Sequence, residues 1–325
     1  MHPSNFPHTG YWIHAGISFF LYNIGHKVNK ERSLPLQDLL IYLILGLCVG
    51  VMSGFFGIGG GFILTPTLIL MGFSPVIAIA TSLLYTVATS LSGVFAHFRL
   101  KNIKWETSIM IGISGIIATQ LAHPFVLLLG KHQLENTIIP LMYIALILYF
   151  SISILVSNSS SKVQTIHNTK YSYVKIVLIG LFAGFISTVL GVGGGFIIVP
   201  LLIGVLAFQP KYAVGTSLLS VFMIVIAGFT TYASTVELDF GVIGSLIVGA
   251  LIGGQLGARV TNVYEDKQVR HFLAGLYIAT GLSLLLKLFQ MDLLGLLILF
   301  SYCLYMLLHF LLHTLKVRLK EKEVS

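Results

Sequence analysis

Nine apolar blocks run through this chain between residues 35 and 313, each roughly 20 residues long, the length at which a helix crosses a hydrocarbon core about 30 Å thick. Charged residues make up only 9% of the sequence, whereas soluble domains carry roughly 25%. We therefore predict an all-α polytopic membrane protein, with spans at residues 35–56, 74–98, 107–129, 135–156, 174–190, 210–235, 240–260, 269–288 and 292–313.

Two glycine clusters interrupt this apolar pattern. The sequence Gly-Ile-Gly-Gly-Gly-Phe at residues 57–62 returns 134 residues later as Gly-Val-Gly-Gly-Gly-Phe at 191–196, and a short apolar run follows each copy. Broken helices at membrane depth are tolerated only where protein or a watery cavity satisfies their backbone. Paired breaks in two related halves indicate the binding site of a secondary transporter. Simple close-packed kinks are the alternative interpretation.

Matching residues outside the clusters reveal an internal duplication. The elements that recur are Thr-Ser-Leu-Leu at 81–84 and 216–219, Gln-Leu at 120–121 and 255–256, and Tyr-Ile-Ala at 143–145 and 277–279. We predict two repeats of about five helical segments each, at residues 35–156 and 174–290, joined by a polar linker at 157–173. An N-terminal extension at 1–34 is expected to form an interfacial helix or short anchor, and an extra C-terminal helix with a basic tail is expected at 291–325.

The distribution of Lys and Arg distinguishes parallel from inverted repeats. With four crossings per repeat, 10 of these residues fall inside and 9 outside, which is no bias. With five crossings per repeat the count becomes 14 inside and 5 outside, as the positive-inside rule requires. The sequence therefore predicts inverted repeats, although Lys27, Lys30 and Arg32 are left outside.

The glycine clusters are suited to an anion. Each would open a short helix whose first amides lack intrahelical partners and whose dipole adds roughly half a positive charge. In inverted halves two such ends can share one anion site near the midplane. Hydroxyl and carboxamide groups repeated in both halves would add donors, or would instead serve helix–helix hydrogen bonding. The predicted substrate-binding residues are Gly59, Gly60, Gly61, Phe62, Thr81, Ser82, Gln120, Gly193, Gly194, Gly195, Phe196, Thr216, Ser217 and Gln255.

Other chemistries find little support. The formal net charge of +8 does not indicate a nucleic-acid partner, because the basic residues lie in short loops and in the C-terminal tail. Cys48 and Cys303 offer no disulfide framework or zinc spacing, and His309 and His313 lack a third metal ligand. The glycine clusters fit neither the dinucleotide-binding nor the P-loop template. We expect no enzyme activity, no catalytic residues, no metal and no cofactor.

The doubled Gly-x-Gly-Gly-Gly-Phe…Pro and the doubled Thr-Ser-Leu-Leu resemble the TauE/SafE family of sulfite exporters. The likeness runs from about residue 40 to about residue 290, and carries over to Gly57, 59–62 and Pro66, and to Gly191, 193–196 and Pro200. It implies a cell-membrane permease for sulfite, sulfonates or related anions, driven in many cases by a proton gradient. The N-terminal extension departs from the compact start of that family.

These observations favour a secondary transporter of small sulfur-containing or organic oxyanions, with alternating access around the glycine-lined site. A passive anion channel on the same scaffold is the alternative. The expected partners are a small anion substrate, the lipid bilayer and protons as coupling ion, with a homodimer left open. We expect a multi-pass protein of the cell membrane whose C-terminus is cytoplasmic.

Overall fold

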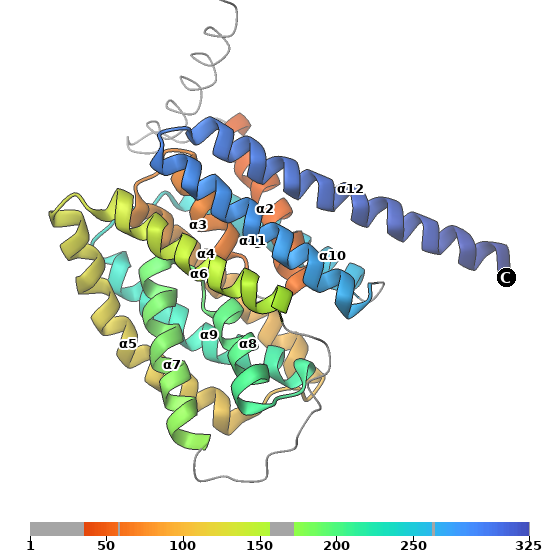
Figure 1. Cartoon of the computed structure of the whole chain (residues 1–325), viewed down its shortest axis with the longest axis horizontal. Coiled ribbons are helices and arrows are strands. Elements are labelled where there is room, and N and C mark those ends of the chain that lie inside the picture. The colour runs from red at the N-terminus through yellow and green to blue at the C-terminus, as the bar shows by residue number, and fades with distance from the viewer. Residues whose placement is uncertain (1–35, 58, 157–171, 262–263, 325) are drawn as a thin grey trace, which may run out of the picture.

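Helices make up almost all of the part of the chain that the computed structural model describes, residues 36–57, 59–156, 172–261 and 264–324 (Figure 1). The predicted extension at 1–34 and most of the predicted linker lie outside the described residues. The helices are α2 (Leu36–Phe56), α3 (Gly61–Leu70), α4 (Pro75–Arg99), α5 (Trp105–Lys131), α6 (Glu135–Val156), α7 (Ser172–Leu190), α8 (Gly195–Leu206), α9 (Pro210–Ala233), α10 (Phe240–Thr261), α11 (Asp266–Leu288) and α12 (Asp292–Val324).

The apolar blocks form the helices that their length predicts. Within the described ranges, nine helices are long and apolar enough to cross a membrane, and each coincides with one predicted span. Two shorter apolar helices, α3 and α8, follow the glycine clusters. The prediction of an all-helical polytopic membrane protein with paired short segments is confirmed.

Glycine geometry explains why α3 and α8 are separate from the long helices before them. Gly60 is the N-cap of α3 and Gly194 is the N-cap of α8. Gly57, Gly191 and Gly194 have φ angles of 66°, 69° and 71°, in the left-handed region that glycine enters without steric cost. The chain therefore leaves one helix and begins another within a few residues.

Each repeat places its first helix against the fourth helical segment of the other repeat. A Cβ added to Gly50 of α2 would lie 2.7 Å from the α-carbon of Ala250 in α10, and one added to Gly184 of α7 would lie 2.5 Å from the α-carbon of Gly115 in α5. Small residues allow such close backbone approach between membrane helices. The pairs α2–α10 and α7–α5 are thus equivalent contacts made by equivalent glycines.

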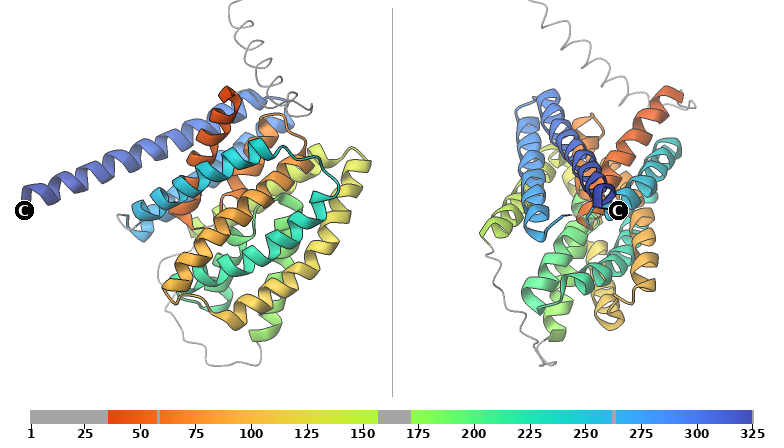
Figure 2. Two further views of the ribbon diagram at one scale, coloured as in Figure 1. Left: turned by 180° about the vertical axis from the view of Figure 1, so that it is seen from behind. Right: turned by 90° about the vertical axis from the view of Figure 1, so that its right-hand side faces the viewer.

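The equivalent helices α4 and α9 pack against each other with opposite directions. Gly93, late in α4, contacts Leu218, early in α9, whereas Gly228, late in α9, faces Leu83, early in α4. The left view of Figure 2 shows the two helices side by side. Inverted repeats require this antiparallel relationship between equivalent helices. The inverted arrangement across a bilayer itself stays a prediction.

Helices α6, α11 and α12 complete one side of the bundle, with α11 between the other two (Figure 1). The ammonium group of Lys287 lies 3.0 Å from a carboxylate oxygen of Asp292, an ion pair across the turn between α11 and α12. The far end of α12 extends beyond the other helices (Figure 2). The predicted extra C-terminal helix is therefore present.

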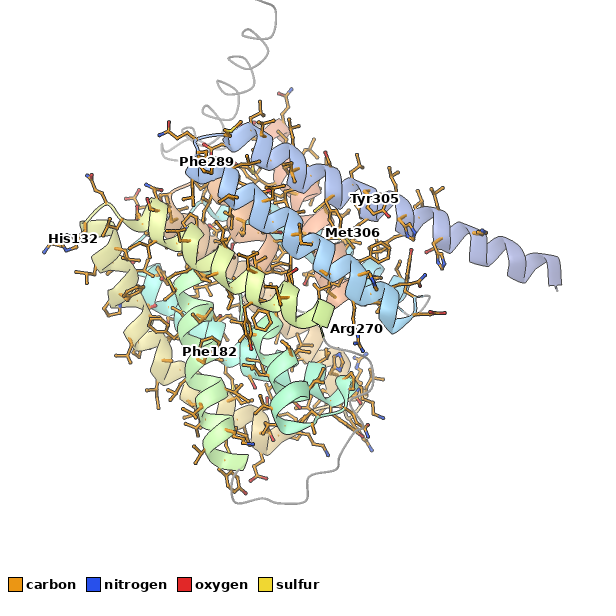
Figure 3. All side chains as sticks on the ribbon, viewed as in Figure 1. His132, Phe182, Arg270, Phe289, Tyr305 and Met306 are labelled. Carbon is orange, nitrogen blue, oxygen red and sulfur yellow. The ribbon has the colours of Figure 1, made fainter. Side chains whose placement is uncertain are left out.

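Apolar side chains cover the outside of the bundle as well as its interior. Phe182 on α7, Phe289 after α11 and Tyr305 on α12 are exposed, whereas Met306 is fully buried (Figure 3). Lipid chains are as apolar as leucine, so exposed apolar residues carry no penalty in a bilayer.

Candidate functional site

The N-terminal ends of the two short helices meet in the interior. The rings of Phe62 and Phe196 stack, with 5.5 Å between their centroids and 25° between their planes, and both side chains are buried. The hydroxyl of Thr65 in α3 donates a hydrogen bond of 3.2 Å to the carbonyl oxygen of Gly191. The structure therefore brings the two glycine clusters together, although they are 134 residues apart in sequence.

Thr86 of α4 lies between the two clusters. A Cβ added to Gly61 would lie 2.7 Å from its hydroxyl oxygen, and the Thr86 side chain also packs against Gly59 and Gly193. The same hydroxyl donates to the carbonyl oxygen of Ser82, at 2.7 Å. One side chain of the first repeat thus contacts the glycine loops of both repeats, and at Gly61 and Gly193 only a glycine leaves room for it.

The N-cap residues of α3 and α8 are glycines, so no N-cap side chain bonds to the first-turn amides of either helix. Helix N-termini with free first-turn amides and a partial positive charge favour a bound anion. The predicted residues at these ends, Gly59, Gly60, Gly61 and Phe62 with Gly193, Gly194, Gly195 and Phe196, are brought into one region of the structure.

The four predicted hydroxyl residues are all buried but differ in their bonding. The Thr216 hydroxyl accepts a hydrogen bond of 3.0 Å from the backbone amide of Lys104, and the Ser217 hydroxyl donates to the carbonyl oxygen of Val214 at 2.9 Å. The Ser82 hydroxyl, by contrast, has no hydrogen-bond partner. The Thr216 hydroxyl thus links α9 to the start of α5, and the Ser217 hydroxyl bonds within its own helix, whereas the Ser82 hydroxyl keeps its full hydrogen-bonding capacity.

The two predicted glutamines lie elsewhere. Gln120 on α5 and Gln255 on α10 are both exposed. The Gln120 amide donates to the hydroxyl of Thr119 at 3.2 Å, and Gln255 lines a surface depression together with Arg259. Their repetition in the two halves reflects equivalent outer positions on α5 and α10, and the structure does not place them with the buried hydroxyls.

Two residues beside the glycine loops, and a third that faces Gly228 of α9, are absent from the sequence prediction. Tyr85, Ser187 and Thr188 are fully buried, and their hydroxyls lack a hydrogen-bond partner. The Tyr85 ring packs on Gly60, and the Ser187 hydroxyl oxygen lies 3.6 Å from the position of a Cβ on Gly194. A signal was available: Tyr85 directly follows Thr-Ser-Leu-Leu, and Ser187-Thr188 precedes the second cluster with only two residues between.

Among the described residues, the side chains nearest the glycine loops are uncharged, so the local electrostatics come from helix ends and hydroxyl dipoles. Lys104 and Lys211 lie instead beside the ring of Tyr212, 4.9 Å and 5.0 Å from its centroid. Among the described residues there is no group of three His, Cys, Asp or Glu side chains that could hold a metal ion.

Fold and site together define a polytopic helical membrane protein with two broken helices that converge from related halves. A family described as Sulfite exporter TauE/SafE matches residues 42–284, most of the chain. The protein belongs to this family of membrane transporters.

Curated relatives carry names of the same kind. A probable membrane transporter protein of Bacillus subtilis, YjnA, is 26% identical over 252 residues, which cover 75% of this chain and 98% of the relative. Another, from Methanocaldococcus jannaschii, is 25% identical over 263 residues, covering 76% and 95% of the two chains. No solved structure matches the chain.

Proposed function

We propose that this protein is a secondary transporter of small sulfur-containing or organic oxyanions, such as sulfite or sulfonates. The observation that carries the proposal is the meeting of two half-helix N-termini, marked by the stacked Phe62 and Phe196, in a buried region lined by uncharged hydroxyls. Membership in the sulfite exporter family supports the same substrate class.

None of the described residues nearest the loops has a basic side chain, and this suits transport. Two helix ends together supply about one unit of positive charge. Backbone and hydroxyl donors would hold an anion reversibly, whereas a buried Arg–anion pair would release it slowly. The site is therefore proposed as a place of transient binding.

Alternating access would rock one repeat against the other around this site. The antiparallel pairing of α4 with α9 supports inverted repeats, and the matched pairs α2–α10 and α7–α5 support a two-fold relationship between the halves. Proton coupling could act through the substrate, because protonated and deprotonated sulfite coexist near neutral pH. We propose a cell-membrane location with a cytoplasmic C-terminus.

Proteoliposomes that contain the purified protein provide the test. Labelled sulfite should accumulate against its gradient when a pH gradient is imposed, and should only equilibrate without one. Rates that do not depend on the pH gradient would reject proton coupling. Flux with no uphill accumulation under any imposed gradient would indicate a passive anion channel, and the absence of any flux would reject anion transport.

The glycine loops are tested by Gly60→Leu and Gly194→Leu, which should block flux, with circular dichroism of each purified variant to establish that the protein is folded. Gly204→Leu, within α8 but with open space where its side chain would go, is the matched control. Wild-type flux in both loop variants would remove these loops from the mechanism.

A further inference from the structure

Unpartnered hydroxyls are concentrated around the glycine loops. Within the described ranges, seven buried side-chain polar atoms lack a hydrogen-bond partner, and three of them belong to Ser82, Tyr85 and Ser187. Buried polar groups are nearly always paired, because an unpaired one loses its hydration without compensation. Several unpaired hydroxyls in one place require an explanation. A bound anion that accepts hydrogen bonds from them would explain their lack of partners in the protein.

Two of these hydroxyls face the two N-cap glycines, one each. The Tyr85 hydroxyl oxygen lies 2.8 Å from the position that a Cβ on Gly60 would take. The Ser187 hydroxyl oxygen lies 3.6 Å from the corresponding position on Gly194. Each short helix therefore begins with a capless N-terminus and a free hydroxyl beside it.

Ser82 extends the same set along α4. Ile79 packs on Gly191 and Thr86 packs on Gly193. Residues three and four apart share one face of a helix, so Ser82 lies on the face of α4 that contacts the second loop. Thr188 faces Gly228 of α9 instead and is left out of the set.

We propose that the hydroxyls of Tyr85, Ser187 and Ser82 donate hydrogen bonds to the transported anion and that the site selects an oxyanion with a single negative charge. This inference rests on the proposed transport function. The three hydroxyl groups are uncharged, and the two helix ends supply about one unit of positive charge. A second negative charge on the ligand would be buried without a counter-charge, which is strongly unfavourable.

The substrate class that follows is a singly charged oxyanion, such as hydrogensulfite, an organic sulfonate or a carboxylate. Sulfate and hydrogenphosphate carry two charges and should be excluded. Methanesulfonate and sulfate are suitable probes, since both present a tetrahedral sulfur of similar size and differ in charge.

Binding is measured on the full-length protein in detergent, at pH 7 and constant ionic strength, by the shift in melting temperature with probe concentration. Methanesulfonate should stabilise the wild-type protein at concentrations at least tenfold below those at which sulfate does. Tyr85→Phe and Ser187→Ala should each weaken methanesulfonate binding by about tenfold, the effect of losing one hydrogen bond to a charged group. Without probe, both variants should melt at or above the wild-type temperature, because each removes an unpartnered hydroxyl.

Matched controls separate ligand contact from folding. Tyr302→Phe and Ser283→Ala remove hydroxyls that donate to the carbonyl oxygens of Phe272, at 2.9 Å, and Ala279, at 2.7 Å. Without probe, these variants should have a lower melting temperature than the wild type, and their response to methanesulfonate should equal that of the wild type. Wild-type affinity in both Tyr85→Phe and Ser187→Ala would overturn the assignment of these ligands. Equal affinity for sulfate and methanesulfonate would overturn the charge selectivity.

The two proposals fail in different ways. If the wild-type protein moves labelled sulfite in proteoliposomes but Tyr85→Phe and Ser187→Ala leave that flux and the probe affinity unchanged, only the present inference is wrong. If the wild-type protein moves no anion, the proposed function is wrong.

Discussion

Phe62 and Phe196 occupy equivalent positions in the two repeats, and their rings stack on each other with 5.5 Å between centroids. Tyr277 meets both rings edge-on, at 5.3 Å from Phe62 and 6.3 Å from Phe196. The second residues of the two short helices are thus held together by aromatic packing. Any motion that separates the halves at this point must break the stack.

This contact should be measurable as a coupling energy. We expect Phe62→Leu and Phe196→Leu each to destabilise the protein, and the double variant to lose less than the sum by about 0.5–1.5 kcal/mol, the range for aromatic pairs. Unfolding by denaturing detergent, applied to the four proteins of the cycle, provides the measurement. Strict additivity would show that the stacked pair contributes no interaction beyond its separate packing.

The contact between α2 and α10 should be intolerant of a single methyl group. We expect Gly50→Ala to destabilise the protein by about 1–3 kcal/mol, because its Cβ would lie 2.7 Å from the α-carbon of Ala250. Gly244→Ala on α10 is the control, since its Cβ would meet open space, and the change should be neutral or stabilising by up to about 1 kcal/mol. Similar unfolding midpoints for the two variants would contradict the close approach.

Thr216 should prove structural. Replacement by Val removes the acceptor for the Lys104 backbone amide and should cost about 0.5–1.5 kcal/mol, the usual net contribution of one hydrogen bond. Because Thr216 is not among the proposed anion ligands, anion affinity should change less than twofold once the loss of folded protein is corrected for. Thermal unfolding and probe titration on the same sample check both statements. A tenfold loss of affinity would assign Thr216 to the anion site instead.

The repeated glutamines should be dispensable for transport. Gln120→Ala and Gln255→Ala remove exposed side chains, and such surface changes are usually within about 0.5 kcal/mol of neutral. We expect sulfite flux within twofold of wild type in both variants, measured in proteoliposomes at equal protein density. Ser82→Ala is the comparison, and its flux should fall. Loss of flux in the glutamine variants alone would place the substrate path on the outer face of α5 and α10.

The main elements of the fold follow from sequence because the bilayer limits the choices. A helix satisfies its own backbone hydrogen bonds in lipid, and its length must match the hydrocarbon core. Apolar block length therefore predicts the nine spans, and the two glycine clusters predict the two short helices. The internal repeat also identifies Phe62 and Phe196 as equivalent residues before their contact is known.

The sequence by itself determined that this is a polytopic helical membrane protein, where its helices break, and that its halves are related. Only the tertiary structure decided which hydroxyls are free: Ser82 has no partner whereas Thr216 bonds to Lys104, although the two residues stand at neighbouring places in one repeated motif. In a membrane the lipid-facing and protein-facing sides of a helix are both apolar, so the pattern of residues does not fix the rotation of each helix. Hydrogen-bond partners depend on that rotation and on the neighbouring helix, which is why Gln120 and Gln255 face outward while Tyr85 and Ser187 face the glycine loops.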